Sequence, residues 1–141
     1  MNLDGNIIRE GSTQLFVPGI ISERGPGKIE GRVFFNRQMA FNRDVSVAMF
    51  HSVVRPRKCL DAMAATGARG ARICHEAPGN YRFIINDKDS LACEYARKNV
   101  ELGSLGNAEV SNADLRCLLA EEKFDYIDID PFGTPIPFVP S

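Results

Sequence analysis

The pattern of apolar and polar residues predicts a repeated strand–helix unit in the C-terminal part of the chain. Four short apolar runs bounded by turn residues indicate buried strands at residues 59–62, 81–85, 108–110 and 124–130. Helical spacing of apolar residues predicts intervening helices at about 70–76, 89–103 and 115–120. Strands that alternate with helices imply right-handed crossovers. We therefore expect an α/β fold with a doubly wound parallel sheet.

The N-terminal part follows a different pattern. Two short extended segments, residues 14–17 and 31–35, are separated by a turn-rich stretch and predict a small β appendage. Asp44 is expected to cap a helix that runs to about Val54. The chain is thus predicted to divide after residue 57 into an appendage with a leading helix and a sheet domain at 58–141.

Composition and charge narrow the class of protein. The chain has 141 residues, of which 44% are hydrophobic, as expected for one soluble core. Residues 1–58 carry nine Lys/Arg and five Asp/Glu, whereas residues 59–141 carry eight and thirteen. A basic segment suits nucleic-acid phosphates, and an acidic one suits a cationic cofactor. With no long apolar run and no signal-peptide pattern, we expect a cytoplasmic protein that does not bind membranes.

Cysteine and histidine spacing gives no support to a metal centre. The four cysteines are far apart in the sequence and form no C-x-x-C pair, so we expect reduced, mostly buried thiols. His51 and His75 have no Cys, Asp or Glu at metal-ligand spacing. No metal is therefore expected.

Polar or loop residues follow the predicted strands where a parallel sheet binds ligands. Gly67, Asp87, Asp114 and Asp130 all fall at carboxyl ends of strands in this reading. The small residues of the loop at 64–70 allow close approach of a ligand, and Asp87 lies where a ribose would be held. The loop is not G-x-G-x-x-G, which favours another nucleoside over a nicotinamide cofactor. A loop built only for packing remains an alternative.

The last strand leads into Asp130, Pro131, Phe132 and Gly133. An aromatic amine is a weak nucleophile, and a strand-end carboxylate can accept hydrogen bonds from its N–H groups and position the nitrogen for attack. Proline stiffens the turn, and the following aromatic ring can stack on a base. The alternative is an ordinary turn that ends the strand.

Taken together, the motifs resemble those of the tRNA (guanine-N2)-dimethyltransferase family, which acts on guanine 26 of tRNA. The matching segments occur in the family order: Phe34-Phe35-Asn36, Met39 to Asp44, Leu60-Asp61-Ala62, Ala65 to Gly70, Asn86-Asp87, Asp114, and Asp128 to Gly133. The resemblance covers nearly the whole chain from about Glu10. It implies a Rossmann-like class I methyltransferase fold, S-adenosyl-L-methionine as cofactor and tRNA as substrate.

The resemblance also implies roles for individual residues. Asp130 would accept hydrogen bonds from the guanine 2-amino group, Pro131 would hold the turn, and Phe132 and Phe34 would sandwich the flipped base. Asp87 would bind the ribose and Asp114 would lie near the adenine. The full set of expected cofactor-binding residues is Arg43, Asp61, Thr66, Gly67, Arg69, Asp87, Asp114 and Leu115.

Two departures from the family pattern affect these expectations. The chain has Asn36-Arg37-Gln38-Met39 where the family usually has Asn-Pro-Arg-Met. Family members also continue beyond the D-P-F-G segment, so we expect a fragment whose sheet is truncated after the fourth strand and has an open edge.

Two alternatives remain open. One is a methyltransferase for another amine in nucleic acid or protein, although those enzymes more often have N-P-P-Y at the catalytic turn. The other is a module that binds S-adenosylmethionine or RNA without turnover. The sequence leaves the oligomeric state open.

Overall fold

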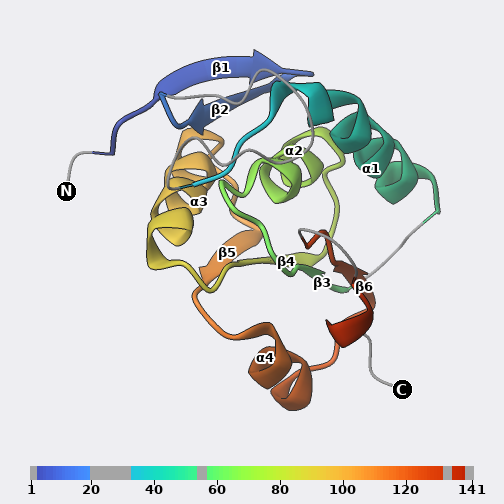
Figure 1. The fold of residues 1–141 in the computed structure, drawn as a ribbon. Helices are drawn as coiled ribbons and strands as arrows, with labels where there is room; N and C mark the ends of the chain where they lie inside the picture. The colour runs from blue at the N-terminus through green and yellow to red at the C-terminus, as the bar shows by residue number, and fades with distance from the viewer. Residues whose placement is uncertain (1–2, 20–32, 54–56, 132–134, 139–141) are drawn as a thin grey trace.

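The computed structural model describes residues 3–19, 33–53, 57–131 and 135–138. A parallel sheet with strand order β5-β4-β3-β6 lies at its centre (Figure 1). Its strands are β3 (Lys58–Asp61), β4 (Arg82–Asn86), β5 (Ala108–Ser111) and β6 (Tyr126–Asp128). An antiparallel hairpin of β1 (Asn6–Glu10) and β2 (Thr13–Val17) forms a second sheet.

Helices cover both faces of the parallel sheet. The α-helices are α1 (Ala40–Val53), α2 (Ala68–Glu76), α3 (Ser90–Leu102) and α4 (Leu115–Glu121), and the 3-10 helices are η1 (Arg37–Met39) and η2 (Ile136–Phe138). Figure 1 shows α1, α2 and α3 on one side of the sheet and α4 on the other, with the hairpin above α2 and α3. The predicted α/β class with a doubly wound parallel sheet is confirmed.

Alternation along the strands separates two hydrophobic cores. Phe83 and Ile85 of β4 face the core under α1, α2 and α3, whereas the intervening Ile84 faces the core under α4. Leu15 and Val17 of the hairpin are fully buried in the first of these cores. The predicted division after residue 57 stays a prediction, but hairpin and sheet share this core.

Several predicted boundaries were wrong in the N-terminal part. The helix begins at Ala40, so Asp44 lies inside α1 and does not cap it. The start is earlier because the Asn36 side chain caps η1 by accepting a hydrogen bond from the Gln38 N–H at 2.8 Å, and η1 continues directly into α1. Residues 33–35 form no strand, and β1 was not predicted.

The C-terminal elements agree more closely with the predictions. All four predicted strands exist, although β6 is shorter than expected and Asp130 lies beyond its end. Among the strands that the structure describes, β6 is an edge of the sheet, as expected. Cys59, Cys74 and Cys93 are buried free thiols, and Cys117 is exposed. No described helix is both long and apolar enough to cross a membrane.

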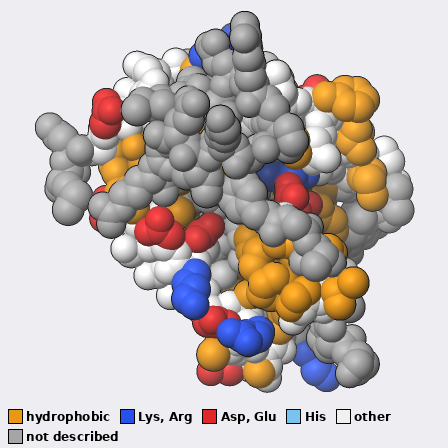
Figure 2. Space-filling view, viewed as in Figure 1, with side chains coloured by type: hydrophobic (Ala, Val, Ile, Leu, Met, Phe, Trp, Pro, Cys, Tyr) orange, Lys and Arg blue, Asp and Glu red, His pale blue; other side chains and the backbone are white. Residues whose placement is uncertain are grey.

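Hydrophobic side chains gather at two places on the visible surface (Figure 2). One is a stripe along α1, where Phe41, Val45 and Met49 are exposed by 77%, 41% and 54%. The other lies near α4 and η2, where Ile136 is 76% exposed. Neither surface is part of the polar site at the strand ends.

Candidate active site

A pocket of about 500 Å³ opens at the carboxyl ends of β3 and β6. Its volume is within the range that small-molecule and cofactor sites usually have. The lining includes seven of the residues singled out from the sequence: Phe34, Arg43, Asp61, Thr66, Arg69, Asp130 and Pro131. Residues distant in the sequence thus meet where a doubly wound sheet binds its ligands.

A tight turn after β3 forms the floor of this pocket. Ala65 and Gly67 both have left-handed backbone conformations, with φ of 49° and 71°. Gly67 begins α2, and an added Cβ at this residue would lie 2.9 Å from the Cβ of Ala96. Asp87 holds the turn from β4, since its Oδ2 accepts a hydrogen bond from the Ala65 N–H at 2.8 Å. Glycine at residue 67 is therefore required by both backbone conformation and close packing.

Arg69 connects α2 to Asp128 at the end of β6 and to Asp130 just beyond it. Its Nη2 donates to Asp130 Oδ2 at 2.7 Å, its Nη1 donates to the Ser46 hydroxyl at 2.6 Å, and its Nε lies 3.6 Å from Asp128 Oδ2. The Arg69 and Asp128 side chains are 12% and 16% exposed, whereas Asp130 is 52% exposed. One guanidinium thus orients the accessible carboxylate that was predicted to be catalytic.

Asp61 lies deeper, at the end of β3, and is 3% exposed. Its Oδ2 accepts a hydrogen bond from the Gly70 N–H at 3.3 Å. Burial, followed by repulsion from Asp128, raises the pKa of Asp61 to about 7, although Arg69 and the Gly70 N–H counteract part of this effect. Burial also raises the pKa of Asp128. The pocket thus has an acidic wall with one arginine within it.

Arg43 forms part of another wall of the pocket. Its Nε and Nη2 donate to the two carboxylate oxygens of Glu10 at 2.6 and 2.7 Å, and Nη2 also donates to the Asn36 carbonyl at 3.0 Å. The guanidinium lies 4.8 Å from the centre of the Phe35 ring. This arginine is therefore held by two different segments of the chain, the end of β1 and residues 35–36.

Three of the predicted cofactor-binding residues, Asp87, Asp114 and Leu115, are not among the residues that line the pocket. Asp87 accepts hydrogen bonds from both Ala65 and Asp89 N–H groups, so its carboxylate is fixed at the edge of the turn. Asp114 caps α4 by accepting a hydrogen bond from the Arg116 N–H at 2.9 Å. Leu115 is 4% exposed and packs in the core under α4.

The predicted base-binding residues are only partly described. Phe34 and Pro131 both line the pocket. Phe132, the predicted second stacking ring, lies outside the described residues. The proposed stacking of a base between Phe34 and Phe132 therefore stays a prediction.

Two buried asparagines position the site and were not predicted to do so. Asn86 connects the ends of the strands, since its Nδ2 donates to the Ala62 and Ala113 carbonyls and its Oδ1 accepts from the Ala113 N–H. Asn99 of α3 donates to the Phe16 and Thr66 carbonyls at 3.0 and 2.9 Å. Asn86 was noted only as part of a segment that resembles the family, and the signal for Asn99 is an amide at a position where the pattern calls for an apolar residue.

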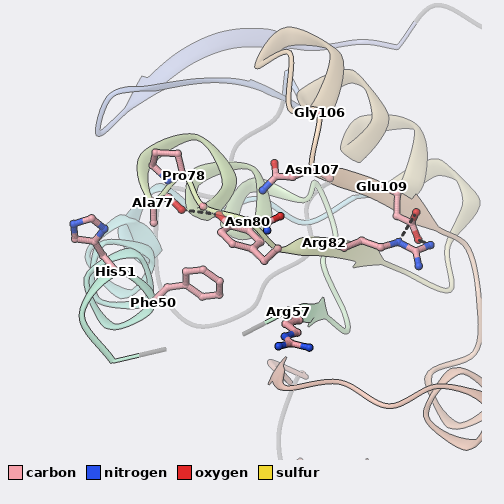
Figure 3. A pocket seen from close by; sticks show the side chains of 13 residues that line it. Phe50, His51, Arg57, Ala77, Pro78, Asn80, Arg82, Gly106, Asn107 and Glu109 are labelled. Atoms are coloured by element: carbon pink, nitrogen blue, oxygen red, sulfur yellow. Dashed lines mark hydrogen bonds and ion pairs between the residues drawn. The ribbon is translucent and has the colours of Figure 1, made fainter. Parts of the chain in front are cut away.

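A larger hollow lies at the opposite, amino-terminal edge of the sheet (Figure 3). Its lining includes His51, Arg57, Arg82, Asn107 and Glu109, and Arg82 is paired with Glu109 at 2.6 Å. The larger size of this hollow does not make it the better candidate for the active site, because ligands of parallel α/β sheets bind at the carboxyl ends of the strands. Within the described ranges, no three His, Cys, Asp or Glu side chains are arranged to hold a metal ion.

Comparison with solved structures agrees with the overall fold. The structure is similar to Trm1 from Pyrococcus horikoshii in complex with S-adenosyl-L-methionine, with a TM-score of 0.76 and 31% sequence identity over 94% of this chain and 38% of that chain. It also shares the fold of Trm5b from Pyrococcus abyssi, with a TM-score of 0.61 and 19% identity over 82% of this chain and 30% of that one.

Sequence comparison gives the family. A tRNA (guanine(26)-N(2))-dimethyltransferase of Saccharolobus islandicus is 42% identical over 137 residues, and that of Sulfurisphaera tokodaii is 40% identical over the same length. These alignments cover 95% of this chain and 36% of each relative, so the chain spans about a third of their length. The model of the N2,N2-dimethylguanosine tRNA methyltransferase family matches residues 15–141. The chain therefore belongs to the N2,N2-dimethylguanosine tRNA methyltransferase family.

Proposed function

We propose that this chain forms the S-adenosylmethionine-binding part of an enzyme that methylates the 2-amino group of guanine 26 in tRNA, first once and then twice. The observation that carries the proposal is the meeting of Asp61, Arg69 and Asp130 at one strand-edge pocket in a chain of this family. We further propose that the reaction takes place in the cytoplasm. No metal takes part in the proposed chemistry.

The residues present suit a cationic nucleoside cofactor. Asp61, Asp128 and Asp130 surround a single arginine, which gives this wall an excess of negative charge toward a sulfonium. The left-handed turn at Ala65 and Gly67 lets the backbone approach a ligand closely. When bound, the cofactor supplies an electrophilic methyl group.

The residues beside the turn would bind the rest of the cofactor. Asp87 would accept hydrogen bonds from the ribose hydroxyls, because its carboxylate is already fixed against the turn and keeps further lone pairs. Asp114 and Leu115 would lie near the adenine. Arg43, Asp61, Thr66, Gly67 and Arg69 complete the proposed cofactor-binding set.

Asp130 would act directly on the guanine. Its carboxylate would accept hydrogen bonds from the 2-amino N–H groups, which places the nitrogen lone pair for in-line attack on the methyl group. As the N–C bond forms and the S–C bond breaks, Asp130 would accept the proton that leaves the nitrogen. Phe34 and Phe132 would sandwich the base, and Pro131 would keep the turn rigid.

Two measurements on the chain test the proposal. Isothermal titration with S-adenosylmethionine should give one site per chain, and no binding would contradict the proposed cofactor site. Mass spectrometry of nucleosides from unmodified tRNA incubated with chain and cofactor should then show methyl- and dimethylguanosine. Cofactor binding without a methylated product would favour the alternative of a binding module without turnover.

A further inference from the structure

Glu10 supplies the carboxylate that binds the pocket-lining Arg43. Glu10 ends β1 and Arg43 belongs to α1, and their side chains are 10% and 8% exposed. Both carboxylate oxygens accept hydrogen bonds from this guanidinium, at 2.6 and 2.7 Å. A two-point contact of this kind fixes the position and the plane of the guanidinium together.

The contacts of Arg43 use only one edge of its guanidinium. Nε and Nη2 donate to Glu10, and Nη2 also donates to the Asn36 carbonyl. The hydrogen bonds between Arg43 and other described residues do not use Nη1. Because Arg43 lines the pocket, a ligand bound there could reach this edge of the guanidinium.

We infer that Glu10 is a positioning residue of the cofactor pocket, which holds the Nε–Nη2 edge of Arg43 so that Nη1 can donate to the amino-acid carboxylate of the cofactor. This inference rests on the proposed function. The family match begins at residue 15, so Glu10 lies outside it. The hairpin is thereby assigned a part in cofactor binding in addition to its packing against α2 and α3.

A purely structural role for Glu10 makes a different prediction. Glu10 Oε1 also accepts a hydrogen bond from Arg72 Nη1 at 3.0 Å, and the Arg72 side chain is 2% exposed. Glu76 binds the same arginine through both carboxylate oxygens, at 2.8 and 2.9 Å, but has no contact with Arg43. Glu76→Gln therefore disturbs the same buried network without releasing Arg43, which makes it the matched control.

The experiment measures S-adenosylmethionine affinity and thermal stability in the chain and in both variants. We expect Glu10→Gln to weaken binding roughly tenfold, about the effect of losing one hydrogen bond to a charged group. Glu76→Gln should lower the melting temperature as much but change the Kd less than about twofold. In an Arg43→Gln background, Glu10→Gln should cause no further loss of affinity, because Glu10 acts through Arg43.

Equal loss of affinity in the two glutamine variants, or additive effects of Glu10→Gln and Arg43→Gln, would overturn the inference. The NMR signal of the Arg43 Nε–H, assigned by its loss in Arg43→Lys, provides a test without ligand. It should move or broaden in Glu10→Gln and persist in Glu76→Gln, and an unchanged signal in Glu10→Gln would also overturn the inference. If the unaltered chain binds no cofactor, the proposed function fails and this signal still decides whether Glu10 fixes Arg43.

Discussion

Asp61 and Asp128 are register partners on the adjacent parallel strands β3 and β6. Two carboxylates therefore lie side by side beneath the first turn of α2, where Gly70 binds one and Arg69 lies near the other. Burial is the main reason that the pKa of Asp61 rises to about 7, and the neighbouring Asp128 is the second. The proposed cofactor is a cation, so the protonation state of these two carboxylates is expected to matter for its binding.

The raised pKa of Asp61 predicts that stability depends on pH. The unfolded chain titrates Asp61 near 3.8 and the folded chain near 7, so the folded state binds the proton more tightly. The stabilisation that the protonated Asp61 side chain gives to the folded state is complete below the pKa of the unfolded chain. It is lost as pH rises through the pKa of the folded chain. Asp61→Asn should therefore gain roughly 2 kcal/mol of unfolding free energy relative to the unaltered chain between about pH 5 and about pH 8.

Urea unfolding followed by circular dichroism at both pH values measures this change. Asp125→Asn is the control, because hydrogen bonds from the Lys58 and Arg57 N–H groups lower the pKa of Asp125 and place its titration below this window. If the difference in unfolding free energy between Asp61→Asn and the unaltered chain stays constant with pH, the result contradicts the raised pKa of Asp61.

Arg69 should matter for turnover more than for folding. Arg69→Lys keeps the charge but cannot contact Ser46, Asp128 and Asp130 together, because an ammonium lacks the planar fork. We expect kcat for methyl transfer to fall at least about tenfold, which corresponds to one misplaced charged hydrogen bond. Steady-state assays with unmodified tRNA measure this. Arg82→Lys, which alters an exposed ion pair at the other edge of the sheet, should leave kcat unchanged.

The sequence predicts a helix or strand well where residues close to its ends in the sequence determine its boundaries. Helix α3 was predicted almost to the residue because Asp89 caps its start, where it accepts a hydrogen bond from the Leu91 N–H, and Gly103 ends it. The strand-edge location of Asp130 was likewise predictable, since alternating strands and helices determine which strand ends meet, whereas Asp61 and Arg69 were expected at the site only from the family resemblance.

The features that could not be predicted depend on contacts between residues far apart in the chain. Asp44 has the residue type of a helix cap, but in the structure it pairs with Arg72 of α2 at 2.6 Å. Glu10 and Arg43 are 33 positions apart, and no local pattern relates them. Ion pairs between such distant residues are selected by three-dimensional packing, so periodicity and motif spacing do not reveal them.

Gly67 should be far less tolerant of substitution than Gly106. In Gly67→Ala, the new Cβ would have both a left-handed φ of 71° and a contact of 2.9 Å with Ala96. We expect a loss of about 1–3 kcal/mol in unfolding free energy and weaker cofactor binding. Gly106 has no atom near an added Cβ and no left-handed φ, so Gly106→Ala should be neutral or slightly stabilising. Equal stability of the two variants in urea would contradict this account of the turn.

Asp130 should be required for methyl transfer but not for cofactor binding. Asp130→Asn preserves the shape of the side chain but removes its charge and one of its two accepting oxygens, so it cannot take up the proton that leaves the guanine amine. We expect methyl transfer to fall by about 100-fold or more, with the Kd for S-adenosylmethionine within about threefold of the original. Activity retained by Asp130→Asn, with tRNA methylation measured by mass spectrometry, would rule out the assigned role.

Asn99 offers a test of how the hairpin supports the cofactor turn. Its side chain is 1% exposed and makes three hydrogen bonds: Oδ1 accepts from the Phe16 N–H at 2.6 Å, and Nδ2 donates to the Phe16 and Thr66 carbonyls. In Asn99→Ala these three backbone groups lose their partner, so we expect a loss of roughly 3 kcal/mol in unfolding free energy.

Asn112→Ala is the control for Asn99, because its exposed amide also donates to two carbonyls, those of Asp87 and Lys88, but water can replace it. Urea unfolding should separate the two variants by about 2 kcal/mol or more. Hydrogen exchange should then show faster opening at the Phe16 and Gly67 amides of Asn99→Ala, because Asn99 joins β2 to the turn before α2. Unchanged exchange at Gly67 would mean that the turn keeps its conformation without the hairpin.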